Sequence, residues 1–157
     1  MEFEALVRER RSIRDYRPNP VSKELIDEVV AIAKQAPSSM NTQQIAIAVQ
    51  LFEAMGIERH DKERRQDWVM RGRRQFDAPV SIVVTIDREL ENDTVSHFDL
   101  GAVTYGLVLA AWTRGLGSVT NGQGIMQSSV VREHAEIPDD EIIMTCVAMG
   151  YPDHDFV

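Results

Sequence analysis

Apolar residues in the first 35 positions of the chain recur at the spacing of an α-helix. A short amphipathic helix is predicted over Glu2 to Glu9, with one buried face. A second apolar stripe follows Ser22, a residue type that caps helix N-termini. Pro37 disfavours helical geometry in the residue before it, so we expect the second helix to end near Gln35.

The rest of the chain alternates between helical and extended patterns. The β-branched run Val80 to Ile86 has no breaker and predicts an interior strand, whereas Phe98 to Arg114 is apolar nearly all round. We expect that long helix at the centre of the core or in a subunit interface, after an acidic loop over Asp87 to Ser96. The other elements expected are helices over Ile45 to Met55, Asp61 to Arg74 and from Ser128 or Ser129 to His134, and strands over Ser118 to Asn121 and Ile142 to Met149.

Composition limits the class of protein. A chain of 157 residues, 43% hydrophobic and 27% charged, predicts one globular domain over 1–157. The net charge of −8 argues against general nucleic-acid binding. One cysteine, Cys146, excludes an internal disulfide, and it lies in an apolar run where we expect a buried, inert thiol. Without a signal peptide or a membrane-spanning stretch, we expect a cytoplasmic protein.

Two basic clusters interrupt the acidic background. Five arginines lie between Arg8 and Arg17, and six basic residues lie between Asp61 and Arg74. The first cluster overlaps a candidate anion site. We interpret the second as a charged helix face, which is the commoner case.

The candidate site has two polar ends joined by the second helix. Arg10, Arg11, Ser12 and Arg14 offer guanidinium forks and a hydroxyl, which suit a phosphate. The loop that follows offers hydroxyl and amide groups that can hydrogen-bond a planar heterocycle. Together they suggest one elongated phosphorylated ligand. The alternative is a solvated face and an ordinary helix-ending turn. The loop residues concerned are Pro37, Ser38, Ser39, Asn41 and Gln43.

The sequence has no signature of metal binding, of a Walker loop or of a hydrolase elbow. Its four histidines are widely spaced, and none stands in a ligand-like pattern. Asp139 and Asp140 follow a proline and are typical of a solvated turn, not of a general acid/base pair. Such a lack of acids, bases and nucleophiles is compatible with a reaction whose chemistry is carried by a bound cofactor.

The order of several short motifs resembles the nitroreductase family of FMN-dependent oxidoreductases. The pair Arg-Arg-Ser-x-Arg and Pro-Ser-Ser-x-Asn-x-Gln carries most of the resemblance. Phe76-Asp77-Ala78-Pro79, Gly115-Leu116-Gly117 and Ala148 to Pro152 resemble later family segments. The resemblance implies an α+β, three-layer fold in which helices flank a central mixed sheet. It also implies an interlocked homodimer with FMN at the interface.

Carried over by position, the resemblance assigns roles to residues of this chain. Arg10, Ser12 and Arg14 would contact the phosphate and the ribityl or ring edge of FMN, with Arg11 beside them. The backbone around Gln123 and Gly124 would face the flavin N5. No side chain would be a catalytic acid, base or nucleophile; the Gly124 amide and Arg14 would stabilise the anionic reduced flavin. The loop residues Pro37, Ser38, Ser39 and Asn41 would line the isoalloxazine or cover it from the partner subunit, and Gln43 is expected to bind the cofactor with them.

Two departures from the family stand out. After Gln43 the chain continues in a helical pattern, where the family has a Pro-Trp and a strand. The family also continues well beyond the segment that ends here at Val157, with a basic tail that wraps the partner. We therefore expect that the chain omits an internal segment near Gln43 and a C-terminal tail.

The function implied is an NAD(P)H-dependent reduction of nitroaromatic or quinone-type acceptors by ping-pong hydride transfer through FMN. One alternative is a flavin-dependent dehalogenase or flavin-destroying relative on the same scaffold. Another is a non-catalytic dimeric module that binds a phosphorylated ligand through Arg10 to Arg14. The third is an α+β domain whose basic clusters are merely solvated.

Overall fold

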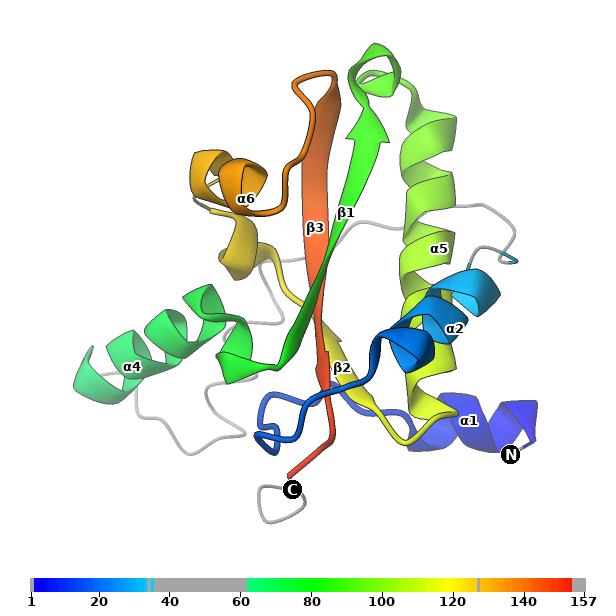
Figure 1. The fold of residues 1–157 in the computed structure, drawn as a ribbon, viewed down its shortest axis with the longest axis vertical. Coiled ribbons are helices and arrows are strands. Elements are labelled where there is room, and N and C mark those ends of the chain that lie inside the picture. Colours follow the sequence, from blue (N-terminus) through cyan, green and yellow to red (C-terminus); the bar gives the residue numbers. More distant parts are fainter. Residues whose placement is uncertain (1, 34, 36–61, 127, 154–157) are drawn as a thin grey trace.

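A computed structural model describes residues 2–33, 35, 62–126 and 128–153 of the chain. Within these residues helices and short 3-10 turns surround a small sheet (Figure 1). The loop from Pro37 to Gln43 and the expected helix over Ile45 to Met55 lie outside the described residues. The elements are α1 (Phe3–Glu9), α2 (Lys23–Ala33), α4 (Lys62–Arg73), η1 (Gln75–Asp77), β1 (Val80–Asp87), η2 (Arg88–Leu90), α5 (Thr94–Trp112), β2 (Gly117–Thr120), η3 (Gly122–Ile125), α6 (Ser128–His134) and β3 (Glu141–Gly150).

The three strands form an antiparallel sheet in the order β1-β3-β2. The last strand in sequence, β3, is therefore the central one. Val83 lies opposite Cys146 on one side of β3, and Val119 lies opposite Ala148 on the other. An isolated bridge between Ser12 and Ser118 is the one parallel pairing in the part of the chain that the structure describes.

Two expectations about the sheet were wrong for the described residues. The run Val80 to Ile86 is not interior, because β1 pairs with β3 alone and forms an edge. A run of β-branched residues indicates that a strand is buried. Helices packed on the sheet can bury an edge strand as well, so the run does not show whether the strand lies at an edge or in the interior. The ladders are antiparallel and not mixed.

Successive residues of β3 face opposite sides of the sheet, as the two-residue period of a strand requires. Val147 and Met149 are fully buried in the larger hydrophobic cluster, which they share with α2 and α5. Ala148 belongs to a smaller cluster on the other side, with Trp68 and Phe76. Figure 1 shows the same division, with α2 and α5 on one side of the sheet and α4 and α6 on the other.

The long helix α5 begins earlier than expected. Its N-cap is Asp93, whose carboxylate accepts hydrogen bonds from the backbone of Val95 (3.3 Å) and Ser96 (3.0 Å). The acidic loop is therefore shorter than predicted and includes the turn η2. One side of α5 packs against α2 and the sheet, while Tyr105 remains 45% exposed.

The other described elements agree closely with the sequence prediction. Helix α1 was predicted within one residue at its start, and the Leu25 amide donates to the predicted cap Ser22, at 3.3 Å. Helix α6, strand β2 and strand β3 were also expected, each within about one residue. No helix in the described part of the chain is long and apolar enough to cross a membrane.

Candidate flavin-phosphate site

The arginine-rich segment leaves α1 and runs beside strand β2. Arg10 caps the end of α1, and its amide donates to the Leu6 carbonyl. Two residues later Ser12 bridges Ser118, and the Ile13 amide donates to the Ser118 carbonyl at 3.1 Å. The segment is thus fixed to the sheet by its backbone, which leaves the arginine side chains available for other contacts.

Arg14 packs against an aromatic residue of α4. Its guanidinium carbon lies 5.9 Å from the ring centroid of Trp68, a cation–π arrangement. Burial lowers the pKa of Arg14 from its ordinary value, and the nearby Tyr16 opposes that shift. An arginine remains charged at neutral pH despite such a shift. Trp68 in turn packs on Phe76, with ring centroids 5.3 Å apart.

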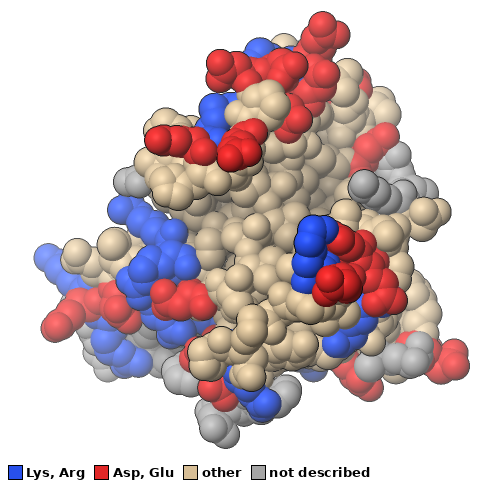
Figure 2. Space-filling model, in the orientation of Figure 1, with Lys and Arg blue, Asp and Glu red and all other residues tan. Residues whose placement is uncertain are grey.

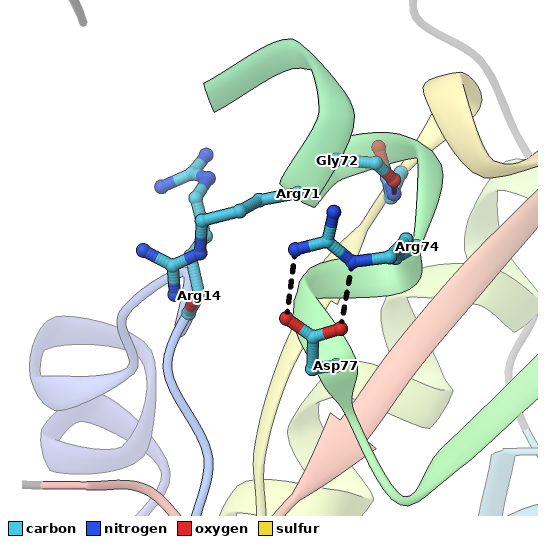
Figure 3. A network of polar contacts seen from close by, with 6 residues as sticks. Arg14, Arg71, Gly72, Arg74 and Asp77 are labelled. Carbon is cyan, nitrogen blue, oxygen red and sulfur yellow. Dashed lines mark hydrogen bonds and ion pairs between the residues drawn. The ribbon is translucent and has the colours of Figure 1, made fainter. Parts of the chain in front are cut away.

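Arg71 of α4 is a site residue that the sequence analysis missed. Its Nη2 donates to the Arg14 carbonyl at 3.1 Å and lies 3.5 Å from the Asp15 carboxylate. Figure 3 shows the side chain of Arg71 extending from α4 toward Arg14, apart from the ion pair of Arg74 with Asp77. The interpretation of this cluster as a solvated helix face is therefore wrong for Arg71, whose side chain is only 22% exposed.

A signal for Arg71 was present in the sequence. It follows Trp68 by three residues, and residues three apart lie on the same face of a helix. A helix that buries Trp68 must therefore direct Arg71 toward the same neighbours. Arg73 and Arg74 did fit the prediction, since Arg73 is exposed and Arg74 forms a surface pair. Figure 2 shows Lys and Arg side chains gathered over α4.

The other predicted phosphate residues differ in their contacts. The Nε of Arg10 is buried and has no hydrogen-bond partner among the described residues. Arg11 is exposed, and its Nη1 donates to the carbonyl oxygens of Arg8 (2.6 Å) and Arg10 (3.1 Å). Ser12 is exposed. A buried guanidinium nitrogen without a partner is suited to an anionic acceptor, because leaving it unpaired is costly.

Gln123 and Gly124, whose backbone is predicted to face the flavin N5, lie in the 3-10 turn η3 after β2. This turn meets α4 at Gly72, the residue next to Arg71. A Cβ on Gly72 would lie 1.7 Å from Oε1 of Gln123, so only glycine allows this approach. Consecutive residues of α4 therefore contact the arginine segment on one side and η3 on the other.

A left-handed turn connects α4 to β1. Gln75, Phe76 and Asp77 all have φ near +56°, a conformation that non-glycine residues rarely adopt. The buried Phe76 ring and the Arg74–Asp77 pair hold the turn in place. The hydrogen bond from Arg74 lowers the pKa of the Asp77 carboxyl.

Cys146 is buried, as expected. Burial raises the pKa of its thiol, while hydrogen bonds from Gln75 and Ser81 act in the opposite direction. A thiol that remains protonated at neutral pH is a weak nucleophile. The described residues hold no group of three potential metal ligands. The predicted flavin residues Pro37, Ser38, Ser39, Asn41 and Gln43 lie outside the described residues, so their role stays a prediction.

Solved structures share this fold. An FMN- and NADPH-dependent nitroreductase from Sphigopyxis sp. strain HMH superposes with a TM-score of 0.86 at 20% identity, covering 99% of this chain and 90% of its own. An FMN-dependent nitroreductase from Mycobacterium smegmatis, in complex with NADPH, gives 0.80 at 17% identity, with 97% and 88% covered.

Sequence relatives include enzymes named for nitroaromatic substrates. The nitrobenzene nitroreductase of Ectopseudomonas oleovorans is 30% identical, covering 95% of this chain and 86% of its own. A 4-nitrobenzoate reductase of Pseudomonas putida is 27% identical, with 97% and 86% covered.

The lengths of these alignments can be compared with the expectation that the chain omits an internal segment near Gln43. The alignment with the nitrobenzene nitroreductase spans 197 positions against a chain of 157 residues, so at least 40 positions lack a counterpart here. A relative from Methanothermobacter thermautotrophicus, 29% identical, aligns over 157 positions with 97% of this chain and 78% of its own. The shorter internal arrangement is therefore shared with at least one relative.

The sequence profile of the Nitroreductase family matches residues 7–151, which include the arginine segment, α4 and η3. The match extends over nearly the whole chain, in agreement with the motif order and the observed fold. The chain belongs to the nitroreductase family of oxidoreductases.

Proposed function

We propose that the protein is an FMN-dependent oxidoreductase that uses NAD(P)H to reduce nitroaromatic or quinone-type acceptors. The observation that carries this proposal is the meeting of two distant segments on one turn of α4. Arg71 contacts Arg14, and Gly72 lies against Gln123. Membership of the nitroreductase family supports the reaction class, and the names of relatives at 27–30% identity support a nitroaromatic acceptor.

The arginine segment fits the phosphate end of FMN. The buried Nε of Arg10 has no acceptor within the described part of the chain, and a phosphate oxygen would supply one. Arg14 keeps its charge beside Trp68, and Arg71 holds the backbone of Arg14 in place. Arg10, Arg14 and the Ser12 hydroxyl would thus hold the phosphate and the adjoining ribityl chain, with Arg11 at the exposed rim.

FMN, when bound, supplies the acceptance and donation of hydride between NAD(P)H and the acceptor. The chain's own residues act by binding and orientation. Fixed positive charge at Arg14 and backbone N–H groups near Gly124 stabilise negative charge on a bound ligand without reorganising. NAD(P)H and the acceptor would bind in turn at the same face of the flavin, and such alternate binding gives ping-pong kinetics.

We also propose a homodimer. Helix α5 leaves Val95 63% and Tyr105 45% exposed, and Phe3 of α1 is 72% exposed. Apolar side chains on a helix that is apolar nearly all round are commonly covered by a partner. A second copy of this chain is the partner that the family implies. Sedimentation equilibrium tests the dimer independently of any bound ligand.

The test of function is an absorbance spectrum of the purified protein with FMN between about 300 and 550 nm, taken before and after NADPH without oxygen. We expect a flavin spectrum that NADPH bleaches and that nitrobenzene, 4-nitrobenzoate or a quinone restores. Flavin that binds but is not bleached would favour the non-catalytic module. A protein that binds no FMN would contradict the proposal.

Paired variants make this test specific for the arginine segment. Arg14→Gln should weaken FMN binding by about tenfold or more, because a charge-assisted hydrogen bond contributes roughly 1.5–3 kcal/mol. Arg17→Gln is the matched control, because Arg17 is exposed and lies three residues further along the same segment. Equal losses in the two variants would mean that only general charge matters.

A further inference from the structure

We propose that Asn121 is a positioning residue that fixes the turn η3 on α4 and thereby sets the affinity of the site for reduced flavin relative to oxidised flavin. The inference rests on the proposed function for its flavin step, but the tether itself is a property of the chain alone. Asn121 follows β2, caps η3 and is only 5% exposed. No motif in the sequence pointed to it.

Every polar group of Asn121 is hydrogen-bonded, and the partners come from separate elements. Two bonds join it to Cys146 of β3, and three more join it to α4, η1 and η3. The backbone amide of Asn121 donates to the Cys146 carbonyl (2.8 Å), and its backbone carbonyl accepts from the Cys146 thiol (2.8 Å). In the side chain, Nδ2 donates to the Gly72 carbonyl (2.6 Å) and to Oε1 of Gln75 (2.9 Å). The side-chain Oδ1 accepts from the Gln123 backbone amide (3.2 Å).

The side-chain amide does more than cap a turn. Capping requires one acceptor, which Ser, Thr or Asp supply equally well. The two donors of Nδ2 reach across to Gly72 and Gln75, and only an amide offers these donors together with the acceptor. Asparagine at this position therefore ties η3 to the end of α4.

Two glutamines complete the connection. Gln123 of η3 lies over Gly72, and Gln75 lies over Gly124, where an added Cβ would be 1.6 Å from its Nε2. Gln75 also donates to the Cys146 sulfur at 2.7 Å. Each side chain thus fills the space above a glycine of the opposite segment. A displacement of η3 would have to break several buried or partly buried hydrogen bonds at once.

The connection has a direct consequence for a bound flavin. Arg71, which holds Arg14, is adjacent to Gly72, which Asn121 holds. The distance between the phosphate end and the η3 backbone is therefore set through α4, in addition to strand β2, which Ser12 bridges at Ser118. If η3 presents N–H groups to a ligand that becomes negative on reduction, loosening η3 weakens the reduced complex more than the oxidised one.

Asn121→Asp tests the tether with little change of shape. The variant retains the acceptor for the Gln123 amide and replaces the two donors by a carboxylate oxygen that faces carbonyl oxygens. Thr104→Val is the control, because it also removes one partly buried hydrogen bond (2.8 Å, to the Leu100 carbonyl) but lies in α5, across the sheet from η3.

The first measurement is amide hydrogen exchange of the protein without flavin. We expect exchange at residues 122–126 to be at least about tenfold faster in Asn121→Asp than in the parent chain or in Thr104→Val, with the sheet unchanged. Unchanged exchange at η3 would overturn the tether. This readout holds even if the chain binds no flavin, so it separates the inference from the proposed function.

The second measurement is the flavin midpoint potential. We expect Asn121→Asp to bind oxidised FMN nearly normally and reduced FMN about tenfold more weakly, a shift of about 30 mV for a two-electron couple. Turnover should fall with little change in KM for NADPH. A lower melting temperature with an unchanged potential, as expected for Thr104→Val, would reduce Asn121 to a structural residue and overturn the flavin step.

Discussion

The two faces of the sheet are stabilised by different kinds of interaction. On the α5 face most of the buried side chains are apolar, and they come from α2, α5 and alternate residues of the strands. On the α4 face a few aromatic residues pack beside buried hydrogen bonds and an ion pair of Arg71 with Asp15. The candidate site lies on the second face. Apolar packing is non-directional, whereas hydrogen bonds fix angles and distances, as a binding site requires.

The largest change in stability is expected from a substitution on the apolar α5 face of the sheet. Leu107→Ala removes a side chain that is only 4% exposed from the cluster between α5 and the sheet. The free energy of unfolding should fall by about 2–5 kcal/mol, because a cavity is added to the lost burial. Urea denaturation measures it. An unchanged stability would mean that this side of α5 is not packed as described.

The next largest expected effect is a loss of stability at alkaline pH. It comes from two buried groups on the α4 side that lose a proton there, the Tyr16 hydroxyl and the Cys146 thiol. Burial raises the pKa of the Tyr16 hydroxyl and, more than any other cause, that of the Cys146 thiol. A raised folded-state pKa means that the unfolded chain loses these protons first. Stability is therefore fully retained below about pH 8.5, the ordinary pKa of a thiol, and declines as the pH rises further.

The alkaline loss should reach up to about 1.4 kcal/mol per pH unit for each group. Urea denaturation at several pH values above 8 measures it. In Tyr16→Phe the decline above pH 10 should be shallower, because the phenol no longer titrates. The same slope in the variant and in the parent chain would contradict the assignment to Tyr16.

Alanine substitutions of two glycines, one in α5 and one in η3, should change the stability of the protein in opposite directions. Gly101 lies in the middle of α5, and a methyl group added there would have no atom within 4 Å, so Gly101→Ala should stabilise the protein by about 1 kcal/mol. Gly124→Ala should destabilise it by a similar amount, about 1–2 kcal/mol, because Gln75 must give up its hydrogen bonds. Thermal unfolding of both variants is the measurement. Stabilisation by Gly124→Ala would contradict the close contact.

The apolar face was largely predictable from the sequence. Helical and strand periodicities report which residues are buried, and they located α1, α2, α5 and β3. Periodicity does not indicate which strands pair with each other, so it could not show that β1 lies at an edge of the described sheet. It also missed the first turn of α5, because the cap Asp93 precedes the apolar stripe.

The α4 face was predicted only in part. The arginine segment, Gln123 and Gly124 were identified through the resemblance to a family. Arg71 and Asn121 were not, because their importance comes from partners distant in sequence, at Arg14 and at Gly72. A helix rich in charge looks solvated until the position of its one buried aromatic residue, Trp68, is taken into account.

The most direct test of the central claim is a fluorescence titration of FMN into Arg71→Ala and Arg73→Ala. Both variants remove one positive charge from the same turn of α4, but only Arg71 contacts Arg14 and Asp15. We predict that Arg71→Ala weakens FMN binding by about tenfold, consistent with roughly 1.4 kcal/mol for the lost contacts, and that Arg73→Ala leaves it nearly unchanged. Equal affinities in the two variants would contradict the claim that Arg71 of α4 positions the arginine segment for binding.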